Sequence, residues 1–233
     1  MCGRFTQAMS WRELVELYRL HDQPEPPLQP RYNVAPSQQV LAIRQEEGKR
    51  RVFLPRWGLV PGWAKDSAIG NRMINARAES LAEKPAFRTA FRQRRCLIPA
   101  SGFYEWRGPR SARQPHYIQA RKGGLLAFAG LWERWRDPAL TDAPPLESCT
   151  IITTAASSDV AALHDRMPVI LSPDQWNAWL DPETPPVLLD GLLQPAPAGR
   201  LVHHPVDRKV GSPKVEGPDL IAPLPEPPGE LPL

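Results

Sequence analysis

The residues with the clearest chemical potential stand at the start of the chain, in Met1-Cys2-Gly3-Arg4. Removal of Met1 would make Cys2 the amino terminus, with a thiol and an α-amine on adjacent carbons. Their reference pKa values of about 8.5 and about 8 leave both groups partly reactive near neutral pH. Such a 1,2-aminothiol condenses with an aldehyde to an imine, and the thiol can then close a thiazolidine ring. A terminus is also a common place for an incidental residue, so this motif alone leaves both interpretations open.

Three further polar residues stand in segments that suggest chemistry. Asn75 lies in INARAE, Glu105 in GFYEW and His164 in LHDRMP. Carboxyl and imidazole groups transfer protons in many enzymes. Each residue also has a structural explanation: Asn75 can close a turn, Glu105 can face water from a strand, and His164 can cap a helix end. Taken singly, they do not decide between the two.

The composition describes a folded protein without export or membrane signals. The chain has 233 residues, of which 42% are hydrophobic, and it contains eight Trp. Charged residues within 11–20 exclude a signal peptide at that place, and no apolar run approaches the ~20 residues of a membrane span. We therefore expect a cytosolic protein of bacterial type that makes no contact with a membrane.

Cysteines and charge limit the classes of partner. The three cysteines, at 2, 96 and 149, have no CxxC spacing, so we expect no disulfide framework, no metal and no cofactor. The net charge of +4 is mild. Between Lys84 and Arg113, however, every charged residue but one is basic. This stretch suits a polyanion such as nucleic acid, although a solvated surface gives the same pattern.

Helix and loop signals are sparse. A capping box at Ser10 and Glu13 predicts a helix that ends near His21. A second helix is expected within 85–94, with its phenylalanines inward, and a third should end near His164. Residues 31–36 are interpreted as a loop, and 55–63 as a rigid aromatic loop.

Strand signals dominate the middle of the chain. We expect a hairpin of 40–43 and 51–54, and antiparallel strands at 96–99, 103–107, 116–120, 125–131 and 149–154. No repeat or sharp change of composition marks a domain boundary. The pattern predicts one α+β domain, and the proline-rich segment after residue 182 should wrap around it or trail from it.

Six segments together resemble, in the same order, the SOS response-associated peptidase (SRAP) family. They are 1–5 (MCGRF), 31–36 (RYNVAP), 57–63 (WGLVPGW), 75–79 (NARAE), 96–106 (CLIPASGFYEW) and 164–169 (HDRMPV). The resemblance runs from Cys2 to about Ile221. It implies the SRAP fold over 2–221, with a mainly antiparallel, barrel-like core and flanking helices, followed by a proline-rich tail at 222–233.

The resemblance implies a DNA-damage protein that senses abasic sites and crosslinks itself to single-stranded DNA, associated with the nucleoid on damage. Cys2 would capture the ring-opened deoxyribose aldehyde, and Asn75 would hold the sugar. Glu105 would act as general acid and base, and His164 would assist opening of the sugar ring. The family is also named a peptidase, so the same thiol would serve removal of Met1. We expect a monomer.

The resemblance also implies a set of DNA contacts. Arginine forks match phosphate geometry, tryptophans give stacking surfaces worth about 1–3 kcal/mol per base, and two further residues would shape the groove. The expected phosphate contacts are Arg4, Arg77 and Arg166; the expected stacking residues are Trp63 and Trp106; the groove residues are Asn33 and Pro36. With eight Trp most must be core, and Trp63 is expected to be exposed.

The chain departs from the family pattern at Ser157, Asp207 and Ser212, none of which is an expected catalytic residue. The turn 107–113 and the insertion 137–147 carry no assignment. Two other functions remain open at this point. One is a cysteine hydrolase that acts on peptides, and the other is a non-catalytic module that binds single-stranded nucleic acid. The sequence does not reveal whether Met1 is removed.

Overall fold

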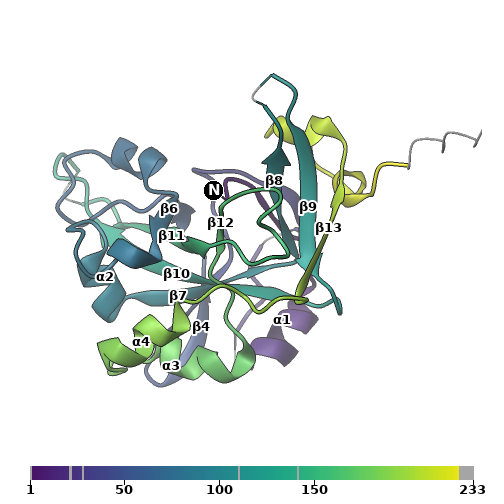
Figure 1. Cartoon of the computed structure of the whole chain (residues 1–233). Coiled ribbons are helices and arrows are strands. Elements are labelled where there is room, and N and C mark those ends of the chain that lie inside the picture. Colours follow the sequence, from purple (N-terminus) through teal and green to yellow (C-terminus); the bar gives the residue numbers. More distant parts are fainter. Residues whose placement is uncertain (1, 21–22, 28, 110, 141, 226–233) are drawn as a thin grey trace, which may run out of the picture.

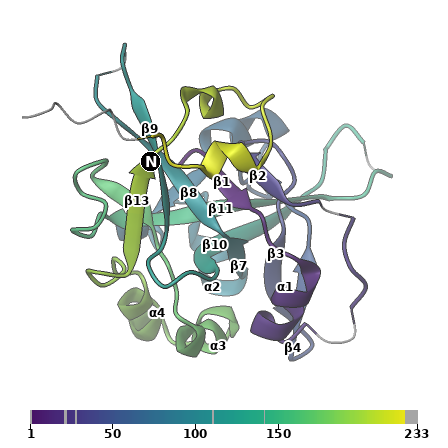
Figure 2. The ribbon, with the colours of Figure 1, turned by 90° about the vertical axis from the view of Figure 1, so that its right-hand side faces the viewer.

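The computed structural model describes residues 2–20, 23–27, 29–109, 111–140 and 142–225. These residues form one domain of two β-sheets with short helices around them (Figures 1 and 2). The five-stranded sheet, in the order β13-β9-β8-β1-β2, contains β1 (Phe5–Gln7), β2 (Arg31–Val34), β8 (Gly102–Arg107), β9 (Gln114–Ala120) and β13 (Leu201–Pro205).

The second sheet has eight strands. Its main path, in the order β12-β11-β10-β7-β3-β4, contains β3 (Ala42–Glu46), β4 (Lys49–Phe53), β7 (Arg95–Ala100), β10 (Leu126–Trp135), β11 (Leu146–Ala155) and β12 (Arg166–Pro168). All pairs along this path are antiparallel, whereas β5 (Arg56–Trp57) and β6 (Asn75–Arg77) join β11 in parallel. The helices are α1 (Trp11–Tyr18), α2 (Arg88–Gln93), α3 (Trp176–Leu180) and α4 (Pro186–Leu192). The prediction of one α+β domain with mainly antiparallel strands is confirmed.

The two sheets meet through aromatic side chains. Phe5 of β1 and Phe103 of β8 each place a ring edge-on to Phe128 of β10, with centroids 5.9 and 5.8 Å apart. Edge-to-face pairs of this kind add about 0.5–1.5 kcal/mol beyond the area that they bury. Cys2 belongs to the same buried cluster, so this residue is anchored between the sheets.

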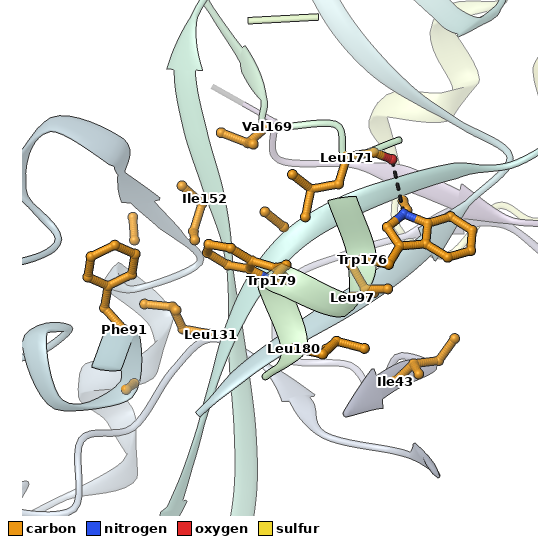
Figure 3. Close-up of a cluster of buried hydrophobic side chains, with 14 of the residues drawn as sticks. Ile43, Phe91, Leu97, Leu131, Ile152, Val169, Leu171, Trp176, Trp179 and Leu180 are labelled. Carbon is orange, nitrogen blue, oxygen red and sulfur yellow. Dashed lines mark hydrogen bonds between the residues drawn. The ribbon is translucent and has the colours of Figure 1, made fainter. Parts of the chain in front are cut away.

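A second core lies between the eight-stranded sheet and the helices. Figure 3 shows Trp179 of α3 among Phe91, Leu131 and Ile152, all of which belong to one buried cluster. The indole N–H of Trp179 donates to Cys96 O at 2.9 Å, so this buried polar group is satisfied. The predicted helix within 85–94, with Phe91 inward, is confirmed as α2.

Turns and caps follow the local sequence closely. The hairpin of β3 and β4 turns at Glu47 (φ 50°) and Gly48 (φ 75°), the two positive φ values that a type I′ turn requires. The capping box of Ser10 and Glu13 is present at the start of α1. The helix ends at Tyr18, earlier than predicted, because Arg19 adopts a left-handed conformation (φ 57°). The predicted end near His21, and residues 226–233 of the predicted tail, lie outside the described residues.

Three predictions of local structure were wrong. Residues 31–34, interpreted as a loop, form β2, because the backbone of β1 supplies hydrogen-bond partners that no local pattern reveals. The helix expected to end near His164 is a series of turns, in which Leu163 N and His164 N both bond to Val160 O. The sequence also predicts a strand at 169–171, whereas β12 ends at Pro168, although Val169 still bonds to the backbone of Ile152.

Close packing of β8 against β9 gives a direct test of this fold. A Cβ on Gly102 would lie 2.4 Å from the Tyr117 ring and 2.6 Å from Ile118 O. We therefore predict that Gly102→Ala lowers the free energy of unfolding by about 1–3 kcal/mol through overpacking. Gly191→Ala is the matched control, since nothing lies within 4 Å of its Cβ position, and it should be neutral or slightly stabilising. Chemical denaturation measures both, and equal stability of the two variants would contradict the packing described.

Candidate functional site

The four predicted catalytic residues come together between the two sheets. Cys2 precedes β1, Asn75 begins β6, Glu105 lies in β8, and His164 lies in the loop before β12. Figure 1 shows β6 and β12 facing β8 across the upper part of the molecule. The charge of Glu105 contributes to raising the pKa of the Cys2 thiol, and His164 acts to lower that of Glu105, so the three side chains lie within electrostatic range of one another.

Asn75 holds the backbone of Cys2. Its Nδ2 donates to Cys2 O at 2.8 Å, which links β6 of the eight-stranded sheet to the start of the chain. Its Oδ1 is buried and has no hydrogen-bond partner among the described residues. An unsatisfied buried acceptor is costly, so it is expected to receive a donor when a ligand occupies the site. The amide can thus fix Cys2 with one end and bind a hydroxyl with the other.

The Cys2 thiol is fully buried and sits 3.9 Å from Arg4 O. Burial, with the Glu105 charge as a second cause, raises the pKa of the thiol far above its ordinary value of 9.0. The resting side chain is therefore a thiol and not a thiolate, which is the nucleophilic form. Any reaction of this sulfur needs a neighbouring group that accepts its proton as the bond forms.

Glu105 is the neighbouring group suited to that task. Its side chain is only 3% exposed. Burial raises the pKa of the carboxyl above its ordinary value of 4.5, against the opposing effect of positive charge that includes His164. A carboxyl with a raised pKa exchanges protons more readily near neutral pH, as a general acid and base must do.

His164 is held at one ring nitrogen. The Nδ1 atom accepts the backbone N–H of Arg166 at 2.9 Å, and the same atom lies 2.7 Å from Asp165 Oδ1. The first contact requires an unprotonated Nδ1, so the neutral ring carries its proton on Nε2, whereas a protonated Nδ1 donates to Asp165.

The expected DNA residues differ in how available they are. Trp63 is 60% exposed, as predicted, and Arg77 is exposed. Trp106 and Pro36 are half-buried. Trp63 and Arg77 thus leave an aromatic ring and a cation exposed at the surface.

The two other expected phosphate contacts are already engaged. Arg4 donates through Nη1 to Asn33 Oδ1 at 2.7 Å, and it also bonds to two backbone carbonyls. Arg166 forms a bidentate pair with Glu79, with contacts of 2.5 and 2.9 Å. The Glu79 partnership was missed from the sequence, although an acid within the same NARAE segment is a signal that could have indicated it. To bind phosphate, either guanidinium would have to share or exchange these partners.

Asn33 is fully buried, which gives it an indirect role. Its Nδ2 donates to Ser212 O at 2.9 Å and to Val215 O at 2.8 Å, while its Oδ1 receives Arg4. It thus ties β2 to the C-terminal segment and shapes the surface through Arg4 instead of touching a ligand directly.

Metal binding and membrane insertion find no support in the part of the chain that is described. No group of three or more His, Cys, Asp or Glu residues there could hold a metal ion. Within the same residues, no helix has the length and apolar composition needed to cross a membrane.

Comparison with known proteins places this arrangement in a family. The family model described as SOS response associated peptidase (SRAP) matches residues 1–213. The chain belongs to the SRAP family. It is 45% identical over 226 residues to the abasic site processing protein YoqW of Bacillus subtilis, covering 95% of this chain and 99% of that protein. It is 29% identical to the abasic site processing protein YedK of Escherichia coli, over 96% of this chain and all of the other.

Solved structures support the same fold. A protein from Bacteroides thetaiotaomicron superposes with a TM-score of 0.84 at 24% identity, over 96% of this chain and 100% of that chain. A phage-related protein from Bordetella bronchiseptica gives a TM-score of 0.68 at 29% identity, over 89% of this chain and 95% of the other. The SRAP fold predicted from the sequence motifs is thereby confirmed.

The buried carboxyl of Glu105 predicts a pH dependence of stability. Burial raises its pKa in the folded protein above its ordinary value of 4.5. Between these two pKa values the folded state binds more protons than the unfolded state, so this residue lowers the free energy of unfolding as pH rises through that window. The side chain of Glu105→Gln is neutral at every pH, so this variant should not lose free energy of unfolding in that pH range. At higher pH it should therefore be more stable than wild type.

Glu83→Gln is the control, because Glu83 is exposed. Denaturant melts across the acidic range measure all three proteins. Parallel curves for wild type and Glu105→Gln would contradict a buried carboxyl.

Proposed function

We propose that the chain captures abasic sites in single-stranded DNA covalently, through the amine and thiol of Cys2 after removal of Met1. The observation that supports this most strongly is the 2.8 Å hydrogen bond from Asn75 Nδ2 to Cys2 O. It fixes the residue that would carry both nucleophiles beside a buried carboxyl and an imidazole. The names of YoqW and YedK point to the same class of lesion.

The first stage is attack by the amine. The ring-opened sugar presents an aldehyde at C1′, and the Cys2 amine adds to it. Glu105 takes a proton from the nitrogen and returns one to the departing hydroxyl, so that water leaves and an imine remains. His164 serves the preceding step: its ring gives a proton to the ring oxygen of the sugar as the C1′–O4′ bond breaks. The C1′ hydroxyl gives up its own proton as it becomes the aldehyde carbonyl, so no proton is gained or lost overall. Such proton transfers contribute roughly 10²–10⁴-fold each.

The second stage closes the ring. The Cys2 sulfur adds to the imine carbon, and the thiol proton ends on the nitrogen, so that only one water is lost in total. Since the thiol is protonated in the buried site, Glu105 would relay this proton; the raised pKa of its carboxyl supports this role. The product is a thiazolidine, in which one carbon of the sugar is bonded to both nitrogen and sulfur.

A peptidase acting on other proteins fits the site less well. A cysteine hydrolase relies on a thiolate formed at low pKa, whereas the Cys2 thiol is fully buried and its pKa is raised. Removal of the chain's own Met1 remains part of the proposal, because capture needs a free Cys2 amine. Intact mass of the purified protein tests that step directly.

Substitution of Cys2 tests the nucleophile. We predict that Cys2→Ala gives no adduct that survives denaturation, because an amine alone forms only a reversible imine. Cys2→Ser should give a weaker adduct, since an oxygen ring reopens sooner. The assay incubates Met-free protein with single-stranded DNA bearing one abasic site and resolves the product on a denaturing gel. A heat-stable adduct of Cys2→Ala at wild-type yield would refute the proposal.

Glu105 should control the rates of capture and release together. The same carboxyl moves protons in both directions, so Glu105→Gln should slow each by roughly 10²–10⁴-fold. The adduct of this variant, once formed, should outlast the wild-type adduct against an excess of fresh abasic DNA. Both rates are measured on protein shown to be folded by its melting curve. If neither rate changes, Glu105 has no catalytic role.

A further inference from the structure

A basic groove begins one residue beyond Cys2. The groove is open, has a volume of about 530 Å³, and is lined by Gly3, Arg4, Trp106, residues 111–113, Arg208 and Gly211. We propose that it is a phosphodiester subsite for the DNA strand on one side of the abasic site, with Arg113 and Arg208 as its phosphate contacts. This proposal rests on the proposed function and extends it to residues outside the reacting centre.

The groove lies on the other face of β8 from the reacting carboxyl. Successive side chains of a strand point to opposite faces, so Glu105 and its neighbour Trp106 diverge. Glu105 is buried among the residues of the site, whereas Trp106 is half-buried and lines the groove. A DNA strand that is bound at Cys2 therefore reaches the groove by passing over Gly3.

Arg4 builds the wall of the groove and is not its free cation. Its guanidinium donates to Val210 O at 2.8 Å and to Gly211 O at 3.3 Å. Both carbonyls belong to the short 3-10 helix η4 (Arg208–Gly211). Arg4 thereby fixes the position of η4, which carries Arg208, relative to Cys2 and Gly3.

The guanidinium groups of Arg113 and Arg208 are available. Both residues are exposed, and neither side chain forms a hydrogen bond or an ion pair with the described residues. They come from segments far apart in sequence, the β8–β9 turn and η4, yet line one groove. A free guanidinium fork matches the two non-bridging oxygens of a phosphate.

The lining favours a nucleic-acid strand over a small anion or an acidic peptide. It contains three arginines and an indole and no acidic side chain. An open groove encloses a small anion poorly. A DNA strand can use both the arginines and the indole, since its phosphates pair with the arginines while a base stacks on the indole. Acidic neighbours are engaged elsewhere: Asp207 and Asp219 lie beside Lys209, and Glu216 accepts the backbone N–H of Tyr32 at 2.8 Å.

The test measures equilibrium binding of single-stranded DNA that carries a tetrahydrofuran analogue of the abasic site. This analogue has no aldehyde, so binding is separated from capture. The double variant Arg113→Gln/Arg208→Gln should bind roughly tenfold more weakly, and the slope of log affinity against log salt should flatten by about 1.4, for two phosphates at ~0.7 each. Arg12→Gln, an exposed arginine of α1, is the matched control and should keep the wild-type values.

Trimming the DNA identifies the side that the groove holds. Removing the nucleotides on one side of the lesion should weaken the wild type to the level of the double variant and leave the variant unaffected, whereas trimming the other side should weaken both alike. The subsite would be overturned if the double variant bound DNA as tightly as Arg12→Gln. It would also be overturned if the double variant still bound more weakly than wild type whichever side of the lesion had been trimmed. If instead wild-type protein forms no adduct with aldehyde-bearing DNA, the proposed function fails while this binding comparison still stands.

Discussion

The hydrogen bond from Asn75 Nδ2 to Cys2 O is the contact on which the site depends. Strand β6 pairs with β11, and β1 pairs with β8, so this one bond joins the start of the chain to both sheets. Burial of Cys2 between the sheets also holds this residue, and the bond adds a fixed position for its backbone carbonyl. With it, the two prospective nucleophiles of Cys2 stand at a fixed place beside Glu105 and His164.

Burial sets the protonation states of this site, and for Glu105 it does so at a cost in stability at neutral pH. A buried thiol and a buried carboxyl both have raised pKa values, because each loses hydration that favoured its charged form. Neither effect helps the fold at neutral pH. Their presence in one small region fits a site arranged for proton transfer, where function often opposes stability.

Local signals predicted much of the fold, and long-range contacts account for the failures. The capping box at Ser10 and the turn at Gly48 depend on neighbouring residues alone, so the helix start and the hairpin could be predicted. Strand β2 could not, since its pairing with β1 spans a long stretch of sequence. The candidate catalytic residues were predicted from ordered motifs, but the buried state of Cys2 and the pairing of Arg166 with Glu79 are three-dimensional facts that the motifs do not contain.

The central claim, that one sugar carbon is bonded to both nucleophiles of Cys2, can be tested on the adduct itself. The adduct is formed without borohydride, denatured, treated with a thiol-alkylating reagent and digested with trypsin, and the peptides are analysed by mass spectrometry. The account predicts that the peptide Cys2-Gly3-Arg4 carries the sugar, less one water, and that its sulfur is not alkylated. A sugar found on a lysine peptide, or a Cys2 peptide that carries both sugar and alkyl group, would contradict it.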